Sequence, residues 1–124
     1  MIQIAHLHKS FGKLKVLDDV SIQLDMGKSV ALIGPNASGK TTLIKCLLGM
    51  VLPDAGNILF DGKNIHNDFS YRNAMGYMPQ IGRYPENMKV SQVFDMLRNV
   101  RNHIGDFDEE LIEAFDIQSI GHKY

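Results

Sequence analysis

The pattern of apolar and polar positions divides the chain into a β-rich beginning, a centre with two short apolar runs, and a helical end. Residues 1–8 alternate between apolar and polar side chains, which is typical of a strand with one wet face. Residues 14–17 and 20–24 predict two more short strands, joined by the aspartates at positions 18 and 19. We therefore expect the chain to open with a mostly antiparallel β layer.

The two apolar runs, residues 30–33 and 74–78, are of the kind that fills a buried parallel strand. Apolar residues at helical spacing follow the first run and predict a helix over residues 41–48. Between this helix and the second run, residues 57–60 predict a strand that ends in an Asp61-Gly62 hairpin turn. A helical turn is expected at residues 70–73.

The last third of the chain is predicted to be helical. Ser91 and Asp108 each precede apolar residues at helical spacing, and both residue types favour the position that caps a helix. Each is therefore expected to mark the beginning of a helix.

A phosphate-loop sequence lies between the first apolar run and its helix. Gly34, Gly39, Lys40 and Thr41 occupy the fixed positions of the pattern G-x-x-x-x-G-K-[ST]. The glycines allow backbone conformations closed to other residues, so that successive N–H groups can surround a polyphosphate. Lys40 is expected to reach the β- and γ-phosphates, Thr41 to ligate Mg²⁺, and Thr42 to be available to the α-phosphate. The structural alternative is a glycine turn before an ordinary helix.

Composition excludes only a few classes of partner and site. A net charge of −1 gives no electrostatic reason to expect nucleic acid or an acidic membrane as partner. The single Cys46 cannot form an internal disulfide, and we expect it to be a buried small hydrophobe in a reducing, cytoplasmic setting. No apolar run approaches the roughly 18 residues that would indicate a membrane span. The five histidines show no convincing metal-ligand spacing.

Two residues outside the loop are candidates for nucleotide chemistry. Phe11 lies in the predicted turn at residues 10–13, where an aromatic ring either plugs the turn or stacks on adenine. Gln80 follows the second apolar run, and the carboxyl end of a strand is the usual place for active groups in open α/β sheets. The structural alternative for Gln80 is a cap on the loop that follows.

Four segments in order resemble the ATP-binding subunits of ABC transporters. They are similar to the family's A-loop, Walker A loop, leucine-proline-x-x-glycine turn and Q-loop, and occupy residues 7–12, 34–42, 52–58 and 76–80. The resemblance continues with weaker motifs to the end of the chain. Ala37 departs from the glycine that many members carry, in a loop that tolerates small residues there.

The resemblance implies an α/β fold with a P-loop NTPase (RecA-like) core, an antiparallel β subdomain and the start of a helical subdomain. These parts are expected at residues 29–80, 1–28 and 81–124 of one nucleotide-binding domain. A Walker B strand, a signature motif and a switch histidine are not found in the sequence. We therefore expect the chain to be the N-terminal part of an incomplete domain, inactive as an ATPase by itself.

By the same resemblance, the ligands are ATP and Mg²⁺. Gln80 is expected to be catalytic and, with Thr41, to face the metal, while Val16 packs beside Phe11 at the adenine. The expected nucleotide-binding residues are Phe11, Val16, Gly34, Asn36, Ala37, Ser38, Gly39, Lys40, Thr41 and Thr42.

The complete protein is expected to hydrolyse ATP and so drive transport through membrane-spanning partner subunits. It would pair with a second nucleotide-binding domain, the same or different, and lie in the cytoplasm against the inner face of the membrane. No nucleic-acid partner is expected. The alternative is a soluble ABC ATPase acting on ribosomes or DNA, although residues 81–100 show no coiled-coil insertion or basic tract. Residues 67–68, 71–73 and 78–85 resemble most the copper-handling ATPase of nitrous oxide reductase maturation.

Overall fold

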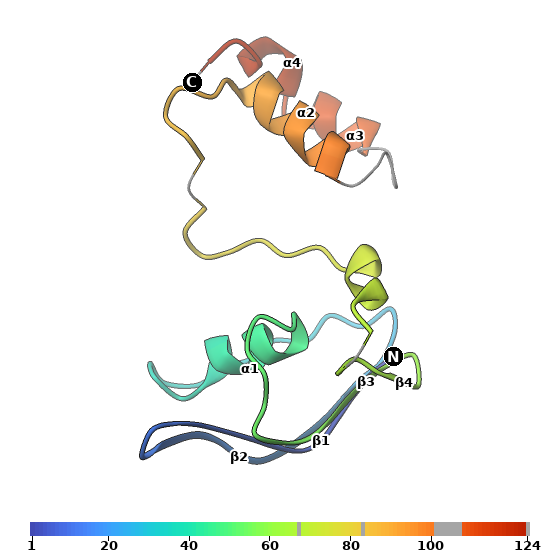
Figure 1. The fold of residues 1–124 in the computed structure, drawn as a ribbon. Helices are drawn as coiled ribbons and strands as arrows, with labels where there is room; N and C mark the ends of the chain where they lie inside the picture. Colours follow the sequence, from blue (N-terminus) through green and yellow to red (C-terminus); the bar gives the residue numbers. More distant parts are fainter. Residues whose placement is uncertain (67, 83, 101–107, 124) are drawn as a thin grey trace. The chain divides into compact units, whose positions relative to one another are not determined.

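A computed structural model describes residues 1–66, 68–82, 84–100 and 108–123. The chain forms two compact units, Met1–Gly76 and Tyr77–Tyr124, whose elements are drawn in Figure 1. Among the described residues, the first unit contains the strands, the short helix that follows the phosphate loop and a 3₁₀ helix, and the regular elements of the second unit are all helices.

The first unit is built on an antiparallel sheet of four strands in the order β2-β1-β3-β4. The strands are β1 (Ile2–Phe11), β2 (Leu14–Leu24), β3 (Ala55–Phe60) and β4 (Lys63–Asn64). The predicted antiparallel β opening is thus confirmed. Between β3 and β4, Asp61 and Gly62 have φ values of 48° and 78°, the left-handed pair that a two-residue hairpin of the predicted kind requires.

The prediction of two short strands at residues 14–17 and 20–24 is wrong, because β2 runs through both without interruption. Its pairing with β1 shifts register near the middle, where His6 and Asp19 have positive φ values of 51° and 53°. A 2.7 Å hydrogen bond between His6 Nδ1 and Asp19 Oδ1 joins the two strands there and lowers the pKa of Asp19. The aspartates that suggested a turn therefore sit in an irregularity within one strand.

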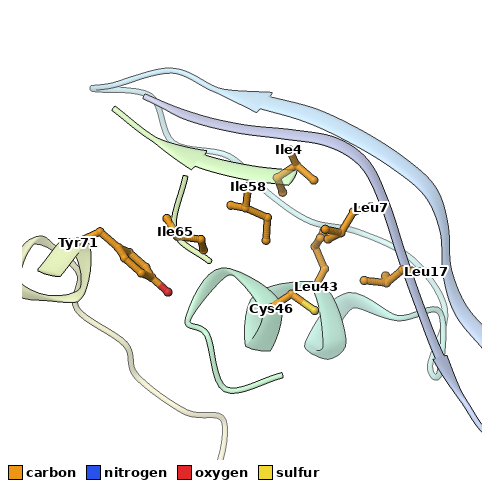
Figure 2. Packing of buried hydrophobic residues seen from close by; sticks show 8 residues of the cluster. All are labelled: Ile4, Leu7, Leu17, Leu43, Cys46, Ile58, Ile65 and Tyr71. Carbon is orange, nitrogen blue, oxygen red and sulfur yellow. The ribbon is translucent and has the colours of Figure 1, made fainter. Parts of the chain in front are cut away.

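Helix α1 (Lys40–Leu47) lies against one face of the sheet and closes the core of the first unit. Figure 2 shows the buried side chains that fill the space between them, with Tyr71 added from the 3₁₀ helix η1 (Ser70–Ala74). The core residues are Ile4, Leu7, Leu17, Leu43, Cys46, Ile58, Ile65 and Tyr71. Cys46 is 1% exposed, as expected, and burial raises the pKa of its thiol.

The two predicted buried parallel strands are not formed. Residues 30–33 have no strand hydrogen bonding, and Val30 and Ile33 are 62% and 89% exposed. The run at 74–78 forms no strand either, because Ala74 ends η1 and residues 75–78 are irregular, with Met78 91% exposed. A parallel strand takes its hydrogen bonds and its burial from neighbours in the same sheet. In the described part of the chain, every strand belongs to the antiparallel sheet, so neither run has such a neighbour.

The second unit contains the helices α2 (Val90–Val100), α3 (Glu109–Ala114) and α4 (Ile117–Ile120). Asp108 caps α3 as predicted, because its Oδ1 accepts the Leu111 N–H at 3.1 Å. Ser91 is not a cap: α2 begins one residue earlier, and the Ser91 N–H donates to the Gly121 carbonyl at 3.1 Å. None of the described helices is long and apolar enough to cross a membrane.

Candidate functional site

The phosphate loop ends at a glycine that no other residue could replace without strain. Gly39 caps α1 in the left-handed conformation, with a φ of 89°, and its carbonyl accepts the Leu43 N–H at 2.9 Å. A Cβ at this position would lie 2.7 Å from the Val16 carbonyl oxygen. Strand β2 therefore packs so closely on the loop that both the backbone conformation and the available space demand glycine.

The glycine at the beginning of the loop has a different role from the one expected. Gly34 does not adopt a left-handed conformation, so conformational freedom is not what it supplies. A Cβ there would lie 3.0 Å from Ser38 Oγ, which means that glycine makes room for this hydroxyl. Ala37 does have a positive φ, 64°, and a side chain in this region costs about 1 kcal/mol relative to glycine. The departure at position 37 is thus accommodated with some backbone strain.

Lys40 folds its ammonium back over the loop. Its Nζ donates to the carbonyl oxygens of Gly34 and Pro35 at 2.7 and 2.6 Å and lies 3.5 Å from Ser38 Oγ. Among the described residues, no carboxylate forms a salt bridge with this group. The ammonium therefore brings an uncompensated positive charge to the loop, held by neutral carbonyls.

Thr41 and Thr42 lie in the first turn of α1, with Thr41 exposed and Thr42 half-buried. No acidic residue is present in that turn, so nothing there offsets the positive potential of the helix N-terminus. Asn36 and Ser38 of the phosphate loop are also exposed. Backbone N–H groups, an ammonium and hydroxyls on one helix end form a site suited to a polyphosphate.

Phe11 ends strand β1 and is 51% exposed, so that part of its ring surface is open. The predicted turn at residues 10–13 is shorter than expected, because Ser10 and Phe11 still pair with β2. Lys9 Nζ lies 5.4 Å from the centroid of the Phe11 ring. Val16, the proposed neighbour of Phe11, lies on the next strand and contacts the loop at Gly39.

Gln80 belongs to the second unit, where it is exposed in a bend, and the predicted strand before it is not formed. The structure brings Val16 and the loop residues together in the first unit, and does not place Gln80 relative to them. The role of Gln80 therefore rests on its position in the sequence.

One residue that joins distant parts of the first unit was not identified from the sequence. Asp54, which reads as part of an ordinary turn, bonds through its carboxylate to Lys9 Nζ and to the Ser10 N–H, both at 2.7 Å. These partners are 45 and 44 residues away along the chain, so no local pattern pointed to them. Both bonds lower the pKa of Asp54 and keep its carboxylate charged, and the bond to Lys9 has the larger effect.

The chain is similar to ATP-binding proteins of transport systems. The sulfate/thiosulfate import ATP-binding protein CysA of Caulobacter vibrioides is 30% identical over 131 residues, which cover 99% of this chain and 39% of that protein. The xylose/arabinose import ATP-binding protein XylG of Sulfolobus acidocaldarius is 46% identical over 65 residues, or 52% of this chain and 26% of that protein. The chain thus spans well under half the length of these relatives.

A solved ATP-binding subunit of an ABC transporter matches all of this chain and 54% of its own, with a TM-score of 0.82 and 23% identity. A nucleotide-free ATP-binding cassette from an ABC transporter matches with a TM-score of 0.74 at 24% identity. These likenesses confirm the expected fold class, a P-loop NTPase core with an antiparallel β subdomain and the start of a helical subdomain. A sequence model of the ABC transporter family matches residues 17–123. The chain therefore belongs to the ABC transporter family, as part of its ATP-binding domain.

Proposed function

We propose that residues 1–124 form part of a single nucleotide-binding domain that binds ATP with Mg²⁺. The observation that carries this proposal is the phosphate loop, in which the Lys40 ammonium bonds to the Gly34 and Pro35 carbonyls at the beginning of α1, whose first turn contains no acidic residue. Lys40 would bind the β- and γ-phosphates, and Thr42 the α-phosphate. Asn36 and Ala37 would contribute backbone N–H groups around the chain of phosphates. The Ser38 N–H donates to the Pro35 carbonyl at 3.3 Å and would exchange this bond for one to phosphate.

The base would stack on the exposed part of the Phe11 ring, with Val16 beside it. Support comes from the half-exposed ring and from Val16, whose contact with Gly39 joins the strand to the loop. Stacking on an aromatic ring is tolerant of ring identity, so this contact would favour a nucleotide over a bare polyphosphate without selecting strongly among bases.

Mg²⁺ fits the residues at the start of α1, because Thr41 offers an exposed hydroxyl oxygen and Mg²⁺ in such sites takes most ligands from phosphates and water. When bound, the ion would neutralise charge on the β- and γ-phosphates. Gln80 would supply an amide oxygen to the metal or to the attacking water, a role that its place in the sequence supports.

In the whole protein, we propose ATP hydrolysis coupled to transport. The relatives named above are import ATP-binding proteins, which supports a partnership with membrane-spanning subunits and a peripheral position on the cytoplasmic face. A second nucleotide-binding domain, identical or not, would complete the catalytic site. The transport system proposed is the copper-handling one of nitrous oxide reductase maturation, on the resemblance of residues 67–68, 71–73 and 78–85.

The test is Lys40→Ala in the full-length protein, with ATP-Mg²⁺ binding measured by calorimetric titration. We expect a loss of about 2 kcal/mol or more, roughly 30-fold in Kd, because charge-assisted hydrogen bonds to phosphate are removed. Lys45→Ala is the matched control, since it removes the same charge from an exposed position in the last turn of the same helix. Equal affinities for Lys40→Ala and wild type would refute the proposed site.

A further inference from the structure

The end of strand β1 is held by a residue outside the sheet. The pairing of β1 with β3 stops at His8, opposite Ala55, which is the first residue of β3. On that edge, the next backbone groups of β1 would lack a partner. Asp54 supplies it: its N–H donates to the His8 carbonyl at 2.8 Å, and its Oδ2 accepts the Ser10 N–H at 2.7 Å. The Asp54 carboxylate thus accepts the backbone N–H bond that a further residue of β3 would otherwise accept.

The second carboxylate oxygen fixes a cation beside the Phe11 ring. Asp54 Oδ1 accepts from Lys9 Nζ at 2.7 Å, and the Lys9 side chain is only 15% exposed. The same Nζ lies 5.4 Å from the ring centroid of Phe11, within the range of a cation–π contact. One carboxylate therefore restrains both the backbone before Phe11 and a charge next to its ring.

We propose that Asp54 is a positioning residue for base recognition, which holds the end of β1 so that Phe11 presents its ring to the base of the nucleotide. The proposal rests on the proposed function, in which Phe11 stacks on the base. Without the Asp54 carboxylate, the backbone of Ser10 loses a bond on one side of β1, and the strand pairing of Ser10 and Phe11 is with Lys15 and Leu14 of β2, at the tip of a hairpin. The ring would then sample more positions, and ordering it again would weaken binding.

The experiment measures the affinities of ATP-Mg²⁺ and of inorganic triphosphate with Mg²⁺ for variants of the full-length protein. Asp54→Ala should weaken ATP about three-fold, below the roughly five-fold limit set by losing one aromatic stacking contact in Phe11→Ala. The affinity for triphosphate should stay unchanged, because the phosphate loop is not altered. Asp54→Asn should give a smaller loss, since its amide oxygen can still accept the Ser10 N–H.

A double variant separates positioning from a general structural effect. In the Phe11→Ala background, Asp54→Ala should cause no further loss of ATP affinity, because the ring that it positions is already gone. Asp61→Ala is the matched control: it removes another exposed carboxylate of the same sheet, which pairs with the amino group of Met1, and should leave both affinities unchanged.

The outcomes distinguish the inference from the proposed function. Equal losses for ATP and triphosphate in Asp54→Ala and Asp54→Asn, or losses that add fully to that of Phe11→Ala, would overturn the positioning role. A selective loss in Phe11→Ala without any loss in Asp54→Ala would overturn the inference alone. If Phe11→Ala itself left the preference for ATP over triphosphate intact, the proposed role of Phe11 would fail, and the inference with it.

Discussion

Replacing Gly39 by alanine tests how the phosphate loop is fixed to the sheet. Two costs combine at this position. The left-handed backbone, with a φ of 89°, costs a side-chain-bearing residue about 1–2 kcal/mol. The new methyl group would also lie 2.7 Å from the Val16 carbonyl oxygen and 3.1 Å from Leu17 Cδ2. Because the nearer contact is backbone, no side-chain rotation relieves it, and overpacking of this kind adds about 1–3 kcal/mol.

Gly62→Ala is the matched control for this change. Its φ is 78°, close to that of Gly39, but a Cβ at position 62 would meet nothing within 4 Å. Gly62→Ala should therefore cost only the backbone strain. In urea unfolding of the full-length protein, Gly39→Ala should lower the free energy of unfolding by at least about 1 kcal/mol more than Gly62→Ala does.

The binding measurement completes the test. In Gly39→Ala, separation of β2 from the loop should weaken ATP binding at least about ten-fold, because the backbone N–H groups of the loop no longer point toward the phosphates. Gly62→Ala should bind ATP with normal affinity. Equal destabilisation by the two substitutions, or normal ATP affinity in Gly39→Ala, would refute the claim that close packing by Val16 shapes the site.

Three further predictions concern other parts of the chain. Gln80→Ala in the complete transporter should lower stimulated ATPase activity while ATP still binds in a filter assay, since an amide orients water and metal without adding charge; normal coupled transport would remove Gln80 from the site. The pKa of Asp54 is lower in the folded protein than its value of about 3.9 in the unfolded chain. The stabilisation by its bonds is therefore fully present above about pH 3.9 and is lost as the pH falls through the pKa of the folded state. The destabilisation by Asp54→Asn, followed by thermal melting, should thus be equal at pH 6 and pH 8 and shrink only in acid. Residues 1–124 expressed alone should show no cooperative melting transition and no magnesium-dependent ATPase activity, because Val30, Ile33 and Met78 leave apolar surface in water.

Features set by neighbours along the chain were predictable from the sequence. The Asp61-Gly62 turn, the Asp108 cap and the helix after the phosphate loop all follow from residues within a few positions of one another. Cys46 was predicted to be buried because it falls among apolar residues of that helix. In each case the pattern and the physical cause are both local, so a single sequence contains the whole signal.

Features set by distant parts of the chain were not predictable in the same way. The runs at 30–33 and 74–78 have the composition of buried strands, but composition cannot supply the neighbouring strands that would pair with them. Asp18 and Asp19 resemble a turn, although pairing with β1 holds them inside one strand. Asp54 likewise gains its role only when folding brings β1 beside the turn before β3.

Lys40 shows how the same local sequence can serve both the loop and its ligand. Its two short bonds to the Gly34 and Pro35 carbonyls span the loop and restrain it. An ammonium has three donors, and its bonds to the carbonyls and to a phosphate differ in the acceptor, which is neutral in the first case and charged in the second. An entering polyphosphate can therefore draw the ammonium from the carbonyls, because it adds the attraction between opposite charges. It follows that Lys40→Ala removes a loop restraint as well as the proposed contact with the phosphates, so its effect on ATP affinity should exceed that of removing either threonine hydroxyl of the proposed site.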